Sequence, residues 1–456
     1  MATASFLPLP SKEILVKEFV GKSIKDVATP AAVLDLQKLK NNCSRMLDAV
    51  ESLNCGWRAH IKTHKTTELT RLQVGDGPGP VNLIVSTIAE AENVLPLLLE
   101  YKSAGRVVNL LYGFPVTPSA VPRLTPIAAA LGPHALTLLI DHPAQLLSVS
   151  SVQTPTSIFI KIDMGGNRAG VIPNTESCSQ LISSVLALEA TGKASLLGLY
   201  AHAGQSYAGD SQSAALDFLR QEFEALLLTS ATLHSTTTST GAHRTHPLVL
   251  SVGATPTTTS IRALLLSTTS LPPSAAQEVS ALKATMRAIR DSGFLIEIHA
   301  GVYPVLDIQQ LSTRALPSSQ LSWADMALTI VAEIASLYPG RGARGSTEAL
   351  LGAGTLALGR EPCKAYPGWG ILTPWNREDA GGGAEGYKGW IVGRTSQEHG
   401  VLTWGGEVGD EDVLVVGQKV RVWPNHACIA GVGFGWYLVV DGGDEIVDVW
   451  VRWRGW

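Results

Sequence analysis

Residues 158–171 read IFIKIDMGGNRAGV, an apolar run that ends in polar residues and glycines. The run Ile158–Asp163 predicts a buried strand, and the glycines after it allow a sharp turn. Helix-like stretches such as Leu216–Leu228 and Ala281–Asp291 separate further runs of this kind. Those runs are Trp57–Thr63, Asn82–Thr87, Val107–Gly113, Leu136–Asp141, Leu197–His202, Pro247–Val252 and Leu295–Ala300. Alternating strands and helices predict an α/β fold with a parallel sheet, and this number of strands closes a (β/α)8 barrel. The alternative is an open doubly wound sheet.

A second domain is expected after the barrel, because Gly, Pro and Trp become frequent from about residue 315. Short alternating runs at 388–392, 413–422 and 435–440 predict a mostly antiparallel β domain. The run Thr29–Asp35 predicts a strand that joins the sheet of this domain. We therefore expect an N-terminal segment at 1–35, the barrel at 36–313 and the β domain at 314–456.

Two polar stretches are interpreted as loops. Thr229–His246 is rich in Ser and Thr and predicts a surface insertion; the alternative is that its three histidines bind a metal. Ala380–Gly386 is rich in glycine but lacks the pattern of a phosphate-binding P-loop.

Composition argues against several classes of partner. The formal net charge of -4 gives no reason to expect nucleic acid or an anionic membrane surface. No apolar run reaches the ~18 residues of a membrane helix, and the first residues lack the pattern of a secretory signal. The chain has 5 cysteines at wide spacing, which fits a reducing, cytoplasmic compartment better than a disulfide framework.

The first candidate site residue is Lys62, in the segment RAHIKTHKT at 58–66. Barrel enzymes carry catalytic groups at the carboxyl ends of their strands. A lysine that is partly buried there can act as a free amine and form a Schiff base. Lys62 continues the alternation of the predicted strand whereas Lys65 lies beyond it, which favours Lys62. The alternative is a basic patch on a solvated loop.

Three further segments follow later strands of the barrel. Arg168 can turn into the barrel mouth and bind a ring oxygen of a cofactor, or form an ion pair with Asp163. The aromatic side chains of Tyr200 and Tyr207, in YAHAGQSY, are candidate pocket walls or packed core residues. The small-residue turn with Gly253 and Thr255 follows the seventh strand, where barrels often bind phosphate; an ordinary tight turn is the alternative.

The last candidate is PNHAC at 424–428, in the β domain. Imidazole with thiolate favours zinc, so His426 and Cys428 can share one ion. The pair supplies only part of a coordination shell, and an open position is typical of catalytic zinc.

These segments, in this order, resemble the D-serine dehydratase and D-threonine aldolase family, within the alanine racemase-like pyridoxal phosphate (PLP) enzymes. HIKTHKT at 60–66 resembles the family's PLP-lysine motif, KIDMGGNRAGV at 161–171 its arginine segment, and GATPT at 253–257 its phosphate loop. SQEHG at 396–400 and PNHAC at 424–428 resemble its C-terminal signature. The resemblance implies PLP bound by Lys62, Arg168, Tyr200, Tyr207, Gly253 and Thr255, and Zn2+ bound by His426 and Cys428.

Within the family, a His-x-Cys pair implies dehydration of D-serine, and a homodimer is implied as well. The alternatives are D-threonine aldolase, 3-hydroxy-D-aspartate dehydratase, a racemase and a PLP carrier without catalysis. Many relatives have an aspartate where this chain has Gly352. Glu398 and His399 are expected to brace their loop; the alternative is that they take part in the chemistry.

Overall fold

The computed structural model of the chain describes residues 7–240, 246–374 and 387–456. The chain forms two compact units. Of the described residues, the first contains Leu7–Pro8, Arg45–Gly301 and Trp453–Trp456, and the second contains Leu9–Ser44 and Val302–Arg452. The units divide after residue 301, earlier than the boundary at 313 expected from the sequence.

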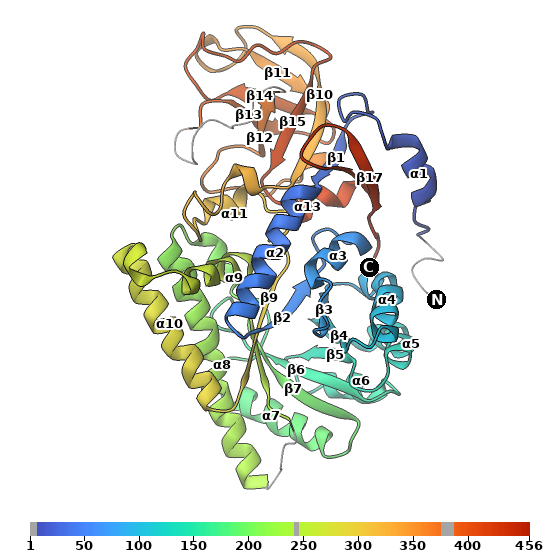
Figure 1. The fold of residues 1–456 in the computed structure, drawn as a ribbon, viewed down its shortest axis with the longest axis vertical. Coiled ribbons are helices and arrows are strands. Elements are labelled where there is room, and N and C mark those ends of the chain that lie inside the picture. Colours follow the sequence, from blue (N-terminus) through green and yellow to red (C-terminus); the bar gives the residue numbers. More distant parts are fainter. Residues whose placement is uncertain (1–6, 241–245, 375–386) are drawn as a thin grey trace. The chain divides into compact units, whose positions relative to one another are not determined.

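The first unit is built on a closed barrel of parallel strands, which confirms the predicted (β/α)8 fold (Figure 1). The last barrel strand pairs with the first and so closes the ring. The strands are β2 (Gly56–His60), β3 (Val81–Val85), β4 (Val108–Pro115), β5 (Leu136–Ile140), β6 (Thr156–Lys161), β7 (Ala194–Tyr200), β8 (Val249–Val252) and β9 (Leu295–Ala300). Every residue of β5 and β6 is buried, because the barrel interior covers one face of these strands and helices cover the other.

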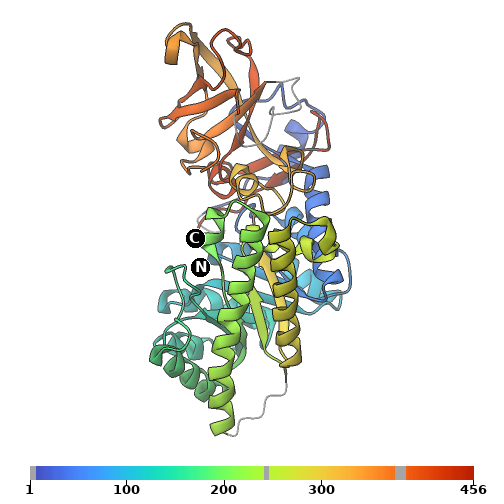
Figure 2. The same ribbon diagram turned by 90° about the vertical axis from the view of Figure 1, so that its left-hand side faces the viewer.

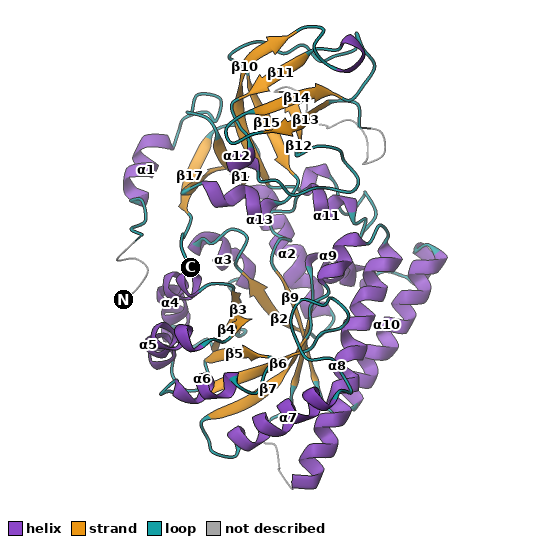
Figure 3. Cartoon of the chain, turned by 180° about the vertical axis from the view of Figure 1, so that it is seen from behind, coloured by secondary structure: helices purple, strands orange, loops and turns teal. Residues whose placement is uncertain are grey.

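The barrel strands are connected by helices, which Figure 3 shows in purple around the orange strands. They are α3 (Thr67–Val74), α4 (Ile88–Ser103), α5 (Val121–Leu131), α6 (Gln145–Ser151), α7 (Glu176–Glu189), α8 (Gln212–Thr240), α9 (Thr255–Ser260) and α10 (Pro273–Asp291). Local sequence starts several of them: the side chains of Thr87 and Thr175 each accept an N–H from the first turn of α4 and α7. Helices α8 and α10 lie side by side (Figure 2).

The predicted loop at 229–246 is wrong over most of its length, because α8 continues to Thr240. Thr229 and Leu233 are buried and extend the apolar stripe of Leu226 by one turn each. This packing outweighs the weak helix propensity of the Ser and Thr residues. Of the three histidines, His234 is in the helix and His243 lies outside the described residues.

The second unit is a mostly antiparallel β domain, as predicted. Strand β1 pairs antiparallel with β10 and parallel with β16, so the strand predicted at the end of the N-terminal segment lies within this sheet. Because β11 pairs with both β14 and β10, part of the sheet closes on itself. The strands are β1 (Ala31–Asp35), β10 (Leu328–Tyr338), β11 (Glu348–Leu351), β12 (Gly370–Pro374), β13 (Trp390–Thr395), β14 (Gly400–Trp404), β15 (Lys419–Pro424), β16 (Trp436–Val440) and β17 (Ile446–Val451).

Short helices flank this sheet: α1 (Lys12–Phe19), α11 (Ile308–Ser312), α12 (Thr355–Leu358) and α13 (Ala427–Ala430). Helix α2 (Leu36–Ser52) follows β1 and leads into the barrel. The glycine-rich stretch Ala380–Gly386 lies outside the described residues. Within the part of the chain that is described, no helix has the length and apolar character needed to cross a bilayer.

Candidate active site

Lys62 lies in the turn after β2, at the carboxyl end of the first barrel strand. The strand ends at His60 rather than at Thr63, because the Lys65 N–H bonds back to the Ile61 carbonyl and closes a turn. Lys62 is half-buried and has no hydrogen-bond or ion-pair partner among the described residues. Lys65, in contrast, forms an ion pair with Glu90 at 2.9 Å. Of the two lysines, Lys62 therefore has the amine that is available to a ligand.

Neutral histidines lie close to Lys62. Burial lowers the pKa of His60 and that of His202 well below the usual value, and the charge of Lys62 lowers both further. Burial also lowers the pKa of His299 well below its usual value. The barrel mouth thus places the uncharged imidazoles of His60 and His202 near Lys62.

Tyr200, at the end of β7, is packed inside the barrel. Its ring stacks on that of His299 with centroids 4.2 Å apart and an angle of 9°, and burial raises the pKa of its hydroxyl. His299 Nδ1 lies 3.1 Å from Ser251 Oγ, while its Nε2 is buried without a hydrogen-bond partner among the described residues. Tyr207 is half-buried in a short helical turn, Gly204–Ala208.

Arg168 lies in the turn after β6 and is exposed. Asp163 accepts the N–H groups of Gly165 and Asn167, which shapes this turn, and the described residues contain no ion pair between Asp163 and Arg168. The Arg168 guanidinium lies near the other mouth residues, since its charge lowers the pKa of Tyr200 and of His202. The predicted cofactor-binding residues Arg168 and Tyr200 are thus in one neighbourhood.

Gly253 and Thr255 lie in the turn between β8 and α9. Gly253 has φ +148°, and a Cβ there would overlap the His299 carbonyl oxygen and come within 2.6 Å of Thr258 Oγ1. Its carbonyl lies 2.6 Å from His202 Nδ1, and its N–H donates to Glu222. Because the N–H of Gly253 is already bonded to Glu222, this residue contributes a backbone conformation to the turn and not a free N–H. Thr255 is buried and begins α9.

His426 and Cys428 lie in the second unit, where β15 leads into α13. Burial lowers the pKa of His426, but its hydrogen bond to Cys428 and the charges of Cys428, Asp307 and Glu361 raise it to about 9. Nδ1 of His426 is buried without a hydrogen-bond partner in the described chain and lies 3.9 Å from Glu361 Oε2. The two side chains thus lie in contact, and each has one atom that can bind a metal ion. No cluster of three or more such donors occurs in the described residues.

The turn between β13 and β14 contains Glu398 and His399, whose side chains are exposed. Backbone atoms hold this turn: the Ser396 and Gln397 carbonyls accept the N–H groups of Thr355 and Leu356. Gly352 is exposed, and a Cβ there would meet only the Glu333 carbonyl oxygen, at 3.6 Å. A Cβ at position 352 would therefore make no close contact.

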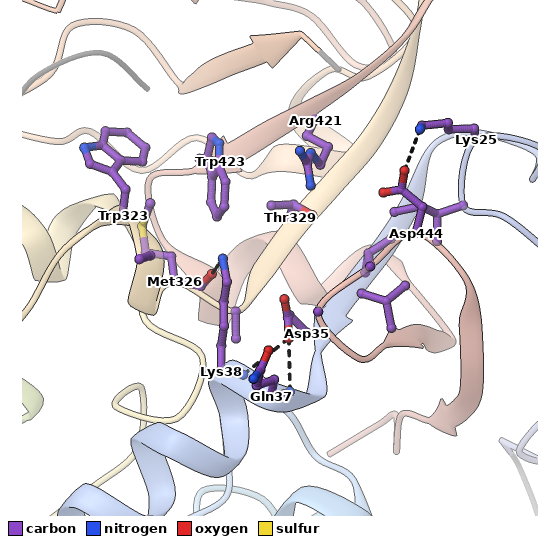
Figure 4. A pocket seen from close by; sticks show the side chains of 17 residues that line it. Lys25, Asp35, Gln37, Lys38, Trp323, Met326, Thr329, Arg421, Trp423 and Asp444 are labelled. Atoms are coloured by element: carbon purple, nitrogen blue, oxygen red, sulfur yellow. Dashed lines mark hydrogen bonds and ion pairs between the residues drawn. The ribbon is translucent and has the colours of Figure 1, made fainter. Parts of the chain in front are cut away.

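The second unit also contains a pocket of ≈ 500 Å³, which includes none of the predicted site residues (Figure 4). In it, Lys38 Nζ donates to the Met326 carbonyl at 3.2 Å and lies 5.3 Å from the ring centroid of Trp423. Burial lowers the pKa of Lys38. Asp35 accepts backbone N–H groups at the start of α2, so its carboxylate has a structural task.

Sequence reasoning assigned no role to His299, Lys161 or Glu222, all of which are buried at the barrel. Burial lowers the pKa of Lys161 to about 8, and its ammonium lies 5.4 Å from the ring centroid of Tyr200. A signal for His299 was present, because it stands near the carboxyl end of the eighth predicted strand.

Comparison with known proteins agrees with this fold. Residues 34–264 match the family model of the alanine racemase N-terminal domain, and residues 327–440 match that of a serine dehydratase domain. The fold and the site thus define an alanine racemase-like barrel enzyme with a dehydratase-type β domain.

The relatives narrow this class. A D-serine dehydratase from Schizosaccharomyces pombe is 38% identical, with 98% of this chain and 96% of that protein covered. A D-serine dehydratase from Saccharomyces cerevisiae is 30% identical, with 97% and 99% covered. The solved structure of D-threo-3-hydroxyaspartate dehydratase from Delftia sp. HT23 has a TM-score of 0.71 at 23% identity, with 95% and 100% covered, which shows a common fold. The chain belongs to the D-serine dehydratase family, which is a family of lyases.

Proposed function

We propose that this protein converts D-serine to pyruvate and ammonia, with PLP bound at Lys62 and a zinc ion bound by His426 and Cys428. The observation that carries the proposal is the half-buried, unpaired amine of Lys62 at the barrel mouth. The full-length similarity to two D-serine dehydratases supports the choice of substrate.

The residues at the barrel mouth fit PLP. Lys62 would hold the cofactor covalently, Arg168, Tyr200 and Tyr207 would contact its ring, and the turn with Gly253 and Thr255 would lie at its phosphate. Buried polar atoms are ordinarily hydrogen-bonded, so His299 Nε2 and Ser206 Oγ, which have no partner in the described chain, suit a ligand with polar atoms. When bound, PLP stabilises negative charge at the α-carbon of an amino acid.

Lys62 would also act as the general base that removes the Cα proton of D-serine. Because burial keeps the nearby imidazoles of His60 and His202 uncharged, neither adds a positive charge beside the lysine. Loss of the β-hydroxyl as water and hydrolysis of the resulting enamine then give pyruvate and ammonia.

The donor set of the second unit fits zinc. An imidazole and a thiol in contact are a pair that zinc prefers, and the buried Nδ1 of His426 has no hydrogen-bond partner in the described residues. A zinc ion there would act as a Lewis acid toward the hydroxyl that leaves. A cysteine-to-alanine variant of a D-threo-3-hydroxyaspartate dehydratase has been solved in a metal-free form.

The test is keto-acid release by the purified protein from D-serine and from L-serine, with and without a chelator. We expect pyruvate from D-serine alone, loss of activity with the chelator and recovery with zinc. Lys62→Ala should lose both activity and the absorbance of bound PLP, whereas the neighbouring Lys65→Ala should keep the absorbance. A Lys62→Ala protein that retains either property would refute the assignment.

The Delftia relative, 25% identical over 94% of this chain, is a D-threo-3-hydroxyaspartate dehydratase, so 3-hydroxy-D-aspartate is the second candidate substrate. Oxaloacetate from that substrate, with no pyruvate from D-serine, would favour it. Glycine and an aldehyde from D-threonine would instead indicate an aldolase. Bound PLP without turnover of any of these substrates would indicate a carrier.

We further propose a homodimer in the cytoplasm. All five cysteines are in the described residues and none forms a disulfide, which fits a reducing compartment. Light scattering on the purified protein tests the dimer: the mass of a single chain would refute it.

A further inference from the structure

Glu222 is a carboxylate that the function proposed above does not use. It lies on α8 between Leu219 and Phe223, within the apolar stripe that faces the barrel, and its exposed fraction is 0%. A buried carboxylate is costly unless hydrogen bonds satisfy it. The hydrogen-bond partners of Glu222 therefore show which segments of the chain it holds in place.

These partners come from two different turns at the barrel mouth. Glu222 Oε1 accepts the N–H of Ala203 at 2.8 Å and the N–H of Gly253 at 3.1 Å. Its Oε2 accepts the hydroxyl of Thr257 at 2.9 Å. One carboxylate thus ties the turn after β7 to the turn after β8 and to the start of α9.

The turn after β8 is also held by hydrogen bonds that its own threonines make. Thr257 Oγ1 accepts the N–H of Ala254 at 2.9 Å, so the hydroxyl that Glu222 holds also fixes the residue after Gly253. Thr258 Oγ1 donates to the His299 carbonyl at 2.9 Å and anchors α9 to β9. Thr255 lies between these fixed points, and its position therefore depends on Glu222.

Burial raises the pKa of Glu222 to about 7, while its three donors and the charge of Lys161 oppose this rise. The hydrogen bonds are thus the main compensation for burying the group, and each is lost if the side chain is truncated.

We propose, resting on PLP as the cofactor, that Glu222 is a positioning residue for the phosphate-binding turn: it holds residues 253–257 in the shape that receives the phosphate, without touching the cofactor. A role of this kind affects the phosphate selectively. Lys62 would capture the aldehyde of PLP and of pyridoxal alike, whereas only PLP carries the phosphate.

The test compares the two aldehydes as probes. Full-length protein stripped of cofactor is titrated with PLP and with pyridoxal, followed by the absorbance of the bound aldehyde, for wild type, Glu222→Ala, Glu222→Gln and Thr257→Val. Glu224→Gln is the matched control, because Glu224 is on the same helix but exposed and paired with Arg220.

In Glu222→Ala, we expect the preference for PLP over pyridoxal to fall by about tenfold or more, as expected for the loss of at least one buried hydrogen bond. Glu222→Gln retains an oxygen that can accept both N–H groups, so it should restore most of the preference. Glu224→Gln should match wild type. If Glu222→Ala does not fold, Thr257→Val carries the test with a loss of about two- to tenfold.

Equal weakening of both probes, or an unchanged preference in Glu222→Ala and Thr257→Val, would overturn the inference and leave the proposed function intact. Wild-type protein that binds neither aldehyde through Lys62 would instead overturn the proposed function, and the inference with it.

Discussion

A buried ion pair inside the barrel allows a quantitative prediction. Arg58 on β2 donates to Glu297 on β9 at 2.7 Å, and the exposed fractions of the two side chains are 2% and 6%. Glu297 also accepts the Ser251 hydroxyl at 2.7 Å, and Arg58 donates to Asn109 Oδ1 at 2.7 Å. The pair therefore joins the strands at which the barrel closes. We consider the single substitution Glu297→Gln.

The loss of stability expected for Glu297→Gln follows from the burial of its partner, Arg58. Glu297→Gln keeps an acceptor for Ser251 but leaves the Arg58 guanidinium charge without a counterion in the interior. Removing one member of a buried pair costs about 3–5 kcal/mol. For a domain of this size, each kcal/mol lowers the melting temperature by about 2–4 °C, which gives a decrease of roughly 6–20 °C. Arg58→Met added to Glu297→Gln removes the unpaired charge and should recover at least half of that decrease.

Thermal unfolding of the full chain, followed by circular dichroism, measures these changes. Glu100→Gln is the matched control, since it breaks the exposed pair with Arg71 and should change the melting temperature little. A Glu297→Gln protein that melts within about 2 °C of wild type would show that the pair is not what stabilises the closure of the barrel. A double variant less stable than the single one would show that charge burial is not the cause of the loss.

Other consequences follow from particular residues. Burial raises the pKa of Glu222 from 4.5 to about 7, so the folded state binds the proton of this carboxyl more tightly than the unfolded state does. The contribution of protonated Glu222 to stability is therefore complete below pH 4.5 and is lost as the pH rises through 7. The melting temperature of wild type relative to Glu222→Gln should therefore fall between pH 4.5 and 7, and a constant difference would contradict the assignment. Gly253→Ala should destabilise the barrel by about 2–4 kcal/mol, because its Cβ would overlap the His299 carbonyl. Gly165→Ala, at φ +106° with no atom within 4 Å, should lower the free energy of unfolding by only about 1 kcal/mol, as measured for both variants by chemical denaturation. Equal losses of stability in the two variants would show that overlap with the His299 carbonyl is not the cause. Gly352→Asp should leave the melting temperature within about 2 °C of wild type, because the position is exposed and open; a larger drop would show that the backbone there is more constrained than its surroundings indicate.

The barrel could be predicted from the sequence because parallel strands are buried on both faces. Such strands appear as continuous apolar runs, and each of the predicted runs overlaps a strand of the closed sheet. The end of a strand was harder to place, as at His60, because it depends on a turn whose hydrogen bonds form between residues with no distinctive pattern. The helix over Thr229–Thr240 was missed for a related reason: only packing shows that Thr229 and Leu233 are buried.

For the candidate site too, residues at the ends of strands could be predicted from the sequence, whereas a residue within a helix could not. Lys62, Arg168 and Tyr200 could be proposed from sequence because each follows or ends a strand, where a barrel places functional groups. Glu222 lies in the middle of a helix, where a charged residue is ordinarily solvent-exposed. Its spacing from Leu219 and Leu226, three and four residues away, nevertheless puts it in the buried stripe. A carboxylate inside an apolar stripe has to find donors within the fold, and here the available donors are the backbone N–H groups of the two turns at the barrel mouth. A charged residue at a core position of a barrel helix can therefore indicate which turns of the mouth are held together.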